Sequence, residues 1–172
     1  MNNKLINGAW NGNLQEVRDA INGGANIEAV GGPHTGTALN AACRNGHVEI
    51  VNLLICFDAN INAANEGGWM HSCLHQAAFY SRFEVCQILV RHGADTNARV
   101  PGNSKFMPGV LPWEGVGRLK GSSRHEELVS FLKNPSEEAK TRGGATSNES
   151  ACFADGPSLV LVARDSPRRC IF

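Results

Sequence analysis

The hydrophobic residues of this chain follow a pattern that occurs twice in nearly the same order. Residues 39–54 read LNAACRNGHVEIVNLL, and residues 74–90 read LHQAAFYSRFEVCQILV. Each stretch begins with small residues, reaches a break, and continues with bulky aliphatic residues three and four positions apart. That spacing places the aliphatic side chains along one side of a helix. The pattern therefore predicts two short helices in each stretch, the second with an apolar stripe.

The apolar stripes belong to the predicted second helices. The second helix that begins in the first stretch and continues beyond it carries four such residues, and that of the next stretch carries three: Ile50, Leu53, Leu54 and Phe57, then Val85, Ile88 and Leu89. The first helices contain small residues, which allow antiparallel helices to approach closely. A single pair cannot bury its stripe alone, so we expect the pairs to stack on one another.

Equivalent residues recur at a nearly constant interval along the chain. Three leucines and three alanines, each set separated by 34 and 35 residues, mark equivalent points: Leu5, Leu39, Leu74, Ala25, Ala59 and Ala94. A period in this range is typical of solenoid proteins, in which each repeat is one supersecondary unit.

The two stretches, extended on both sides, resemble the ankyrin repeat family. Residues 36–64, GTALNAACRNGHVEIVNLLICFDANINAA, match the family's unit from the opening Gly-Thr to the closing Ala-Asn-Ile-Asn. Residues 72–98 match it again, and His75 stands at the family's helix-opening histidine. Four residues depart from the family's pattern and leave the resemblance intact: Ala38 and Cys73 at a proline position, Asn40 at a histidine position and Asp58 at a glycine position.

The resemblance implies an all-α ankyrin-repeat solenoid. We expect about four helix-turn-helix units in residues 1–134, the last of them irregular. The expected units and the mostly disordered tail that follows them have these approximate bounds: 1–30, 31–64, 65–99, 100–134 and 135–172.

The two ends of the predicted stack differ from its middle. At the positions equivalent to Ile50 and Leu53, the first unit carries Glu16 and Asp19. A terminal repeat needs such a solvent-facing outer side. At the other end, residues 124–132, RHEELVSFL, predict one more second helix, whose apolar stripe of Leu128, Val129 and Leu132 faces the third unit.

A segment rich in glycine and proline, residues 100–122, takes the place of the first helix of the fourth unit. We expect its apolar residues to cover the end of the stack, and contact with a partner is the alternative. These residues are Phe106, Met107, Val110, Leu111 and Trp113.

Composition narrows the possible partners. Lysine and arginine total 16 and aspartate and glutamate total 16, so no net charge favours nucleic acid. The apolar stretches are shorter than the roughly 20 residues of a membrane-spanning helix, so we expect no membrane contact. The start of the chain has no apolar run typical of a secretory signal. These features favour a monomeric protein of the cytoplasm or the nucleus.

Catalytic groups and metal ligands do not converge in the sequence. It contains no GxxxxGK[ST] or GxGxxG motif and no evident nucleophile with a base, so we expect neither an enzyme nor a cofactor. His71, Cys73 and His75 alternate as zinc ligands can, but no fourth ligand is spaced to join them. We therefore expect no metal, and we expect Cys43 and Cys86 to pack in the core.

A stack of helix pairs presents an extended, rigid surface that suits protein recognition. In the family that this sequence resembles, the turn tips and the exposed side of the first helices contact partners. The candidate binding residues lie at the ends of three first helices and in two turn tips: Trp10, Asn11, Arg44, Asn45, Phe79, Tyr80, His34, Thr35, Glu66 and Trp69. Trp, Tyr and Arg are enriched in interface hot spots. For Trp10 and Phe79 the alternative is packing against neighbouring units.

Two asparagines stand eight residues after a leucine of the repeat. Asn62 follows Leu54 in this way, and Asn97 follows Leu89. The resemblance implies that an asparaginyl hydroxylase can modify residues at this position. The alternative is that both asparagines only stabilise their turns.

Three hypotheses for function remain at this point. The first is a non-catalytic protein-binding module, a scaffold or adaptor whose partner is a protein of unknown identity. The second is self-association or an assembly role through the tail or the 100–122 loop. The third is a truncated product of a longer repeat gene with no activity of its own.

Overall fold

The computed structural model describes residues 1–31, 36–63, 72–100, 109–116 and 123–135. Within these residues the secondary structure is helical, with no strand. The helices of the described part are α1 (Asn2–Asn11), α2 (Leu14–Asn22), α3 (Ala38–Asn45), α4 (Val48–Cys56), α5 (Cys73–Phe79), α6 (Phe83–Arg91) and α7 (Ser123–Lys133).

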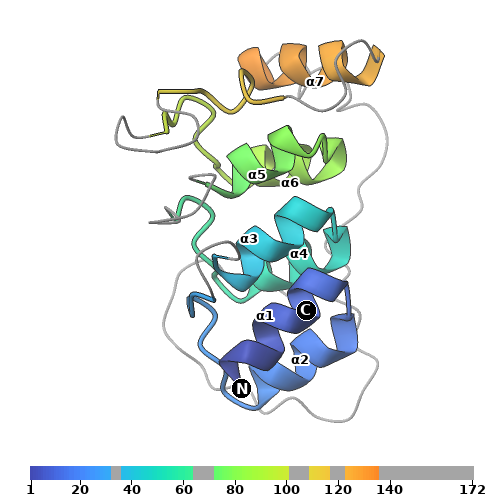
Figure 1. Ribbon diagram of the computed structural model, residues 1–172, viewed down its shortest axis with the longest axis vertical. Coiled ribbons are helices and arrows are strands. Elements are labelled where there is room, and N and C mark those ends of the chain that lie inside the picture. The colour runs from blue at the N-terminus through green and yellow to red at the C-terminus, as the bar shows by residue number, and fades with distance from the viewer. Residues whose placement is uncertain (32–35, 64–71, 101–108, 117–122, 136–172) are drawn as a thin grey trace.

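The helices form a stack of antiparallel pairs (Figure 1). Helix α1 packs with α2, α3 with α4, and α5 with α6, and the pairs follow one another along the long axis of the molecule. The first helices α1, α3 and α5 also contact one another in succession. Helix α7 lies beyond the third pair, at the end opposite to α1 and α2 (Figure 1). This arrangement confirms the all-α stack that the repeated pattern predicts.

Hydroxyl side chains begin the first helices of the second and third pairs. The Oγ1 atom of Thr37 accepts a hydrogen bond from the N–H of Asn40 at 3.3 Å. The Oγ atom of Ser72 accepts from the N–H of His75 at 3.4 Å. Each bond satisfies an N–H group that has no partner inside the first turn of its helix. Equivalent residues therefore start α3 and α5.

The break between the two helices of a pair is a left-handed turn. Gly12 ends α1 with φ 78°, and Gly46 ends α3 with φ 83°. The equivalent residue after α5 is Ser81, with φ 53°. Glycine adopts such angles without a steric penalty, and a residue with a Cβ atom does not.

The core extends through all three pairs. The equivalent leucines Leu5, Leu39 and Leu74 are each at most 1% exposed. In the second helices Leu54 and Leu89 are fully buried. Four further members of the predicted stripes are buried or partly buried against the core, as predicted: Ile50, Leu53, Val85 and Ile88.

Phe57 is the exception, and its assignment to the apolar stripe is wrong. Helix α4 ends at Cys56, and the Phe57 side chain is 43% exposed. Asp58 follows with φ 59°, a left-handed conformation. The chain therefore leaves the helix before a further turn can carry Phe57 to the buried side.

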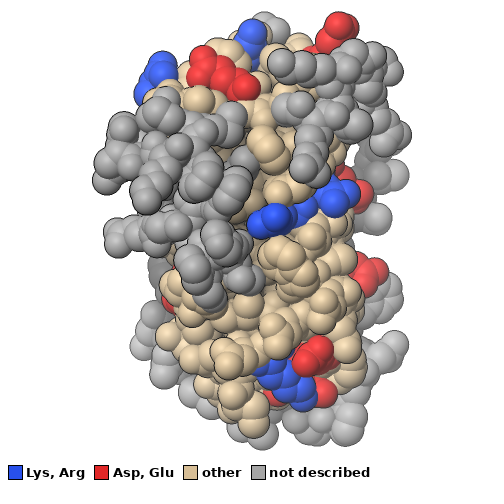
Figure 2. Space-filling model, in the orientation of Figure 1, with Lys and Arg blue, Asp and Glu red and all other residues tan. Residues whose placement is uncertain are grey.

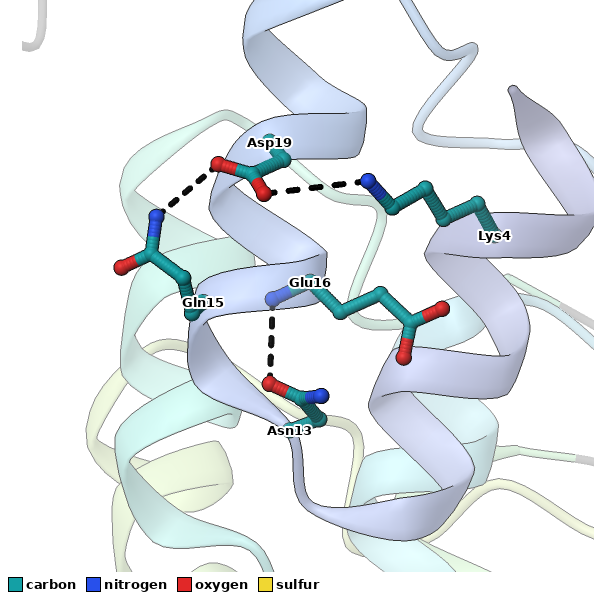
Figure 3. Close-up of polar contacts among 5 residues, drawn as sticks. All are labelled: Lys4, Asn13, Gln15, Glu16 and Asp19. Carbon is teal, nitrogen blue, oxygen red and sulfur yellow. Dashed lines mark hydrogen bonds and ion pairs between the residues drawn. The ribbon is translucent and has the colours of Figure 1, made fainter.

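Polar side chains cover part of the first pair (Figure 3). Asp19 accepts a hydrogen bond from Gln15 Nε2 at 2.9 Å, and its other oxygen lies 3.7 Å from the Nζ atom of Lys4. The Oδ1 atom of Asn13 accepts from the N–H of Glu16 at 3.1 Å and caps α2. Asp19 is exposed, so the outer side of the first unit carries the polar, solvent-facing residue expected at this position.

Residues 109–116 cover the opposite end of the third pair without forming a helix. Leu111 and Val116 are buried, and Trp113 packs against the core. The Nζ atom of Lys133 lies 4.7 Å from the centroid of the Trp113 ring, a cation–π contact. The predicted covering role therefore holds for this part of the segment, whereas residues 101–108, with Phe106 and Met107, lie outside the described residues.

Helix α7 supplies the fourth apolar stripe. Leu128 and Leu132 are each 1% exposed, and Val129 is partly buried against the core. Phe131 was not part of the predicted stripe, yet it is buried, and its ring centroid lies 5.8 Å from that of Phe83 in α6. The Phe131 ring thus joins α7 to α6. Among the described residues, α7 has no first helix to form a pair with.

Some predictions concern residues outside the described ranges. They include the tail over 136–172 and the turn-tip residues His34, Thr35, Glu66 and Trp69. Among the helices that are described, none has both the length and the apolar character needed to cross a membrane.

Candidate protein-binding surface

Trp10, Arg44 and Tyr80 form one row across three helix pairs. They stand at the carboxyl ends of α1, α3 and α5, where Tyr80 is the residue that ends α5. The guanidinium carbon of Arg44 lies 5.0 Å from the centroid of the Trp10 ring and 4.9 Å from that of Tyr80. The cation is therefore held between two aromatic rings, one from each neighbouring unit.

The side chains of this row pack against one another and still remain partly exposed to solvent. Trp10 is 36% exposed, and Arg44 and Tyr80 are half-buried. Phe79 is also half-buried, and its ring meets the Tyr80 ring edge-to-face, with centroids 5.1 Å apart. The packing alternative for Trp10 is thus part of the geometry, because its ring contacts the next unit, but a large part of the ring still faces solvent.

The backbone at the end of α1 is tied to the second unit. The Nδ2 atom of Asn45 donates to the carbonyl oxygen of Trp10 at 3.0 Å and to that of Ala41 at 3.2 Å. The Nε2 atom of His47 lies 3.2 Å from the same Trp10 oxygen, and it donates because a carbonyl oxygen only accepts. Asn11 is exposed beside this junction. These bonds fix the position of Trp10 relative to Arg44.

The end of α3 is tied to the third unit in an equivalent way. The Nε atom of Arg82 donates to the carbonyl oxygen of Arg44 at 3.2 Å. The stem of Arg82 passes over Gly46, where an added Cβ would lie 2.8 Å from the Cδ atom of Arg82. At Gly12 an added Cβ would lie 2.6 Å from the His47 ring. Each glycine therefore gives room to a side chain of the following unit.

The residue that precedes the second helix makes a different hydrogen bond in the first unit than in the second and third units. Asn13 caps its own helix α2, whereas His47 and Arg82 make no capping bond to α4 or α6. Both instead reach back to a carbonyl of the preceding unit. In the first unit the Asn13 side chain serves the local cap instead. Arg82 was not among the predicted binding residues, although it follows His47 by 35 residues and stands after a predicted helix break.

A second set of hydrogen bonds joins the turns at the other end of the helix pairs. The Oε1 atom of Glu28 accepts from the N–H of Asn60 at 2.8 Å. One unit later, Asn62 Oδ1 accepts from the N–H of Asp95 at 3.0 Å, and Asn62 Nδ2 donates to the Gly93 carbonyl at 3.2 Å. These bonds hold successive turns in a constant register.

The two candidate modification sites differ in their surroundings. The Asn62 side chain is engaged with the next unit through two hydrogen bonds. Asn97 is exposed, and its backbone N–H donates to Asp95 Oδ1 at 2.8 Å. Among the described residues, no hydrogen bond of the Asn97 side chain is present. Asn62 therefore has a structural role that Asn97 lacks in this part of the chain.

Cys73 and His75, two of the three residues considered as zinc ligands, contact other protein groups. The Sγ atom of Cys73 lies 3.6 Å from Asn40 Oδ1. His75 Nε2 lies 3.2 Å from the carbonyl oxygen of Val110, and its Nδ1 lies 2.8 Å from Ser72 Oγ. His71 lies outside the described residues, and within those residues no three potential ligands gather as a metal site requires.

The cysteines of the repeats are buried thiols. Cys43, Cys73 and Cys86 are fully buried, as packing in the core predicts for the first and the last. Burial, with a smaller contribution from the neighbouring Cys73 thiol, raises the pKa of Cys43 well above its usual value. Burial likewise raises the pKa of Cys86. Thiols in this state are poor nucleophiles and poor metal ligands.

A small hollow lies between the first two units. Its volume is about 200 Å³, and its lining includes Gly12, Leu14, His47 and Glu49. Pockets for small molecules typically hold about 300–1,000 Å³. The hollow is therefore the size of one side chain of a partner rather than of a cofactor.

Comparison with known proteins identifies the repeat. A family model described as ankyrin repeats (3 copies) matches residues 5–100. The Notch-regulated ankyrin repeat-containing protein of Homo sapiens is 37% identical over 82 residues, which are 46% of this chain and 70% of that protein. Protein phosphatase 1 regulatory subunit 12A of Mus musculus is 33% identical over 82 residues, 48% of this chain and 8% of that protein. The NF-kappa-B inhibitor cactus of Drosophila melanogaster is 34% identical over 102 residues, 57% of this chain and 18% of that protein.

The matched range extends over the three helix pairs from Leu5, within α1, to Val100, after α6. The match and the structure therefore agree on the extent of the regular repeats. They also agree with the 34- and 35-residue intervals between equivalent leucines. The chain belongs to the ankyrin repeat family.

Proposed function

We propose that this protein is a non-catalytic protein-binding module of the cytoplasm or nucleus, and that a partner docks on the row formed by Trp10, Arg44 and Tyr80. The observation that carries the proposal is the position of the Arg44 guanidinium between the Trp10 and Tyr80 rings. Three units thus contribute to one continuous surface of the residue types that dominate interface hot spots.

The rigidity of this surface supports a binding role. Association costs free energy when flexible side chains become ordered at an interface. Here the backbone of Trp10 is held by Asn45 and His47, and that of Arg44 is held by Arg82. The row is ordered before any partner arrives, so less of the contact energy is lost on binding.

The relatives support the class of function. Ankyrin repeats serve as protein-interaction modules, and two matched proteins are named as an inhibitor and as a regulatory subunit. Because the match covers a small share of those two chains, it concerns the repeats that they have in common with this protein. We infer a regulatory or adaptor role by analogy, with the turn tips as a second part of the interface.

Affinity capture with matched variants tests the proposal. The test variant combines Trp10→Ala, Arg44→Ala and Tyr80→Ala, and the control combines Phe57→Ala and Arg91→Ala, which replace exposed residues elsewhere. We expect both variants to unfold cooperatively and only the test variant to lose specific partners. Each central hot spot contributes about 2 kcal/mol or more, so the loss should be large. Retrieval of the same proteins by both variants would place the interface elsewhere.

Self-association is the alternative class. In residues 109–116, Leu111 and Trp113 are used within the chain, against the end of the stack. This part of the loop therefore offers less apolar surface for a second copy than its composition suggests. Light scattering over a range of concentrations separates the two functions, because a protein that stays monomeric does not assemble through the loop or the tail.

A further inference from the structure

Two guanidinium groups gather at the carboxyl end of α3. Arg44 belongs to its last turn, and Arg82 reaches the same place from the start of α6 by donating to the Arg44 carbonyl. His47 stands at the start of α4, between them in sequence. Figure 2 shows Lys and Arg side chains grouped midway along the stack, with uncharged surface below them and an acidic side chain at the right end of the group.

Arg82 is positioned rather than freely moving. Its Nε atom is bound to the Arg44 carbonyl, and its stem passes over Gly46, where only a hydrogen atom separates it from the backbone. The side chain is nevertheless exposed. A guanidinium group has five N–H donors in a planar fork, so the terminal nitrogens of Arg82 are presented to solvent in a defined direction.

No carboxylate of the described residues pairs with Arg82. Lys4 and Asp19 form an ion pair in the first unit. Glu84 stands two residues after Arg82, yet the two form no ion pair within these residues. A carboxylate of a partner protein would supply the negative charge that Arg82 does not find among the described residues.

We propose that the row of Trp10, Arg44 and Tyr80, extended by Arg82, binds an acidic peptide segment of a partner protein. Carboxylates of the segment accept hydrogen bonds from the terminal nitrogens of Arg82, and its apolar side chains lie against the exposed part of Trp10. This inference rests on the proposed function and adds the chemistry of the partner.

Other anionic partners fit less well. The chain has equal numbers of basic and acidic residues, so it lacks the net charge that draws proteins to a nucleic acid backbone. The aromatic rings flanking Arg44 give the surface an apolar part that a peptide side chain covers. Paired guanidinium and carboxylate groups have matching planar geometry, which favours a carboxylate-bearing peptide.

Fluorescence anisotropy with defined peptides tests the inference on the full chain. The probe is a fluorescein-labelled peptide of alternating glutamate and leucine, and the matched control has glutamine in place of glutamate. We expect the glutamate peptide to bind about tenfold more tightly, and we expect added salt to reduce the difference. Equal binding of the two peptides would overturn the inference.

Variants of α6 locate the site. Arg82→Gln should weaken binding of the glutamate peptide about tenfold, and Arg82→Lys, which keeps the charge, should weaken it less. Arg91→Gln is the control, because Arg91 is exposed at the opposite end of the same helix. Equal losses for Arg82→Gln and Arg91→Gln would show nonspecific attraction and would overturn the inference.

Two further probes exclude other partner classes. A phosphoserine peptide or a single-stranded oligonucleotide that bound tightly while the glutamate peptide did not would also overturn the inference. Failure here is distinguishable from failure of the proposed function. If the triple variant loses its partners but no acidic preference appears, only the partner chemistry is wrong, whereas retained partners would refute both.

Discussion

Ser81 occupies, with φ 53°, the left-handed position that Gly46 fills with φ 83° one unit earlier. The substitution of serine for glycine adds a Cβ atom where the backbone tolerates it poorly. The Ser81 hydroxyl oxygen is also buried without a hydrogen-bond partner among the described residues. The third unit therefore carries a local cost that the first two avoid with glycine.

Ser81→Gly should raise the free energy of unfolding by about 1 kcal/mol. The change removes both the strained φ and the unsatisfied hydroxyl, and these gains exceed the entropy cost of glycine in the unfolded chain. Urea unfolding followed by circular dichroism measures the effect. Ser81→Ala is the control, because it removes the hydroxyl and keeps the strain, so its gain should be smaller. A less stable Ser81→Gly variant would contradict this account.

Gly46→Ala should lower the free energy of unfolding by about 2 kcal/mol or more. The new methyl group meets the Arg82 stem at 2.8 Å in addition to imposing a strained φ. Gly24→Ala provides the comparison, since Gly24 has φ 79° and nothing within 4 Å of an added Cβ. The difference between the two variants measures the contact with Arg82, and equal losses would show that this contact contributes nothing.

Asn62→Ala should cost about 1–2 kcal/mol of stability, because it removes two hydrogen bonds between the second and third units. Asn97→Ala should change stability by less than about 0.5 kcal/mol, as expected for an exposed surface residue. Chemical denaturation of the two variants beside the wild type gives both values. Similar losses for both would contradict the difference seen between the two turns.

Asparagine hydroxylation should follow the same difference. An asparaginyl hydroxylase must draw its target side chain away from the repeat, and the Asn62 side chain is bound to the Asp95 and Gly93 backbone. We therefore expect Asn97 to be modified more readily than Asn62. Mass spectrometry of the protein after treatment with such an enzyme reads both sites. Preferential modification of Asn62 would contradict the expectation, and no modification would favour a purely structural role.

The buried thiols should make stability fall in alkaline solution. Burial raises the pKa values of Cys43 and Cys86, so the folded protein keeps these protons when the unfolded chain has lost them. The stability that the protonated thiols contribute is therefore fully present below the unfolded pKa of about 8.5. Above that pH the free energy of unfolding decreases by up to about 1.4 kcal/mol per pH unit for each thiol. Unfolding curves between neutral and alkaline pH measure the slope.

The Cys86→Ala variant is the control, and its loss of stability per pH unit should be smaller than that of the wild type. Equal slopes for variant and wild type would contradict the contribution of the Cys86 thiol.

In the native protein, exposed Cys56 should react with a thiol reagent well before Cys43, Cys73 and Cys86. Peptide mapping of the modified protein can verify this order.

The helix pairs and their core were predictable because the information is local. Alternation of small and bulky residues at helical spacing marks each helix, and a constant interval aligns Leu39 with Leu74. Equivalent residues in a stack face equivalent neighbours, so counting aligns Trp10 and Arg44 with Phe79. The ring that lies against Arg44 is instead that of Tyr80, one residue further along the chain.

Details at the edges of a unit were less predictable. Phe57 has the right spacing for the stripe, but α4 ends before it and leaves the ring exposed. Phe131 lies outside the predicted stripe and is buried against Phe83. The end of α4 explains the exposure of Phe57, and the neighbouring helix α6 explains the burial of Phe131, so the helical period alone does not determine burial.

The amino-acid order was sufficient for the family, the repeat length and the buried sides of the helices, since these depend on periodic hydrophobicity along one segment. The sandwiching of Arg44 between two rings and the return of Arg82 to the Arg44 carbonyl emerge from the folded stack. Such contacts join residues about 35 positions apart, and their existence depends on the separation and rotation between units. No local pattern specifies those quantities, because they result from the packing of all the helices together.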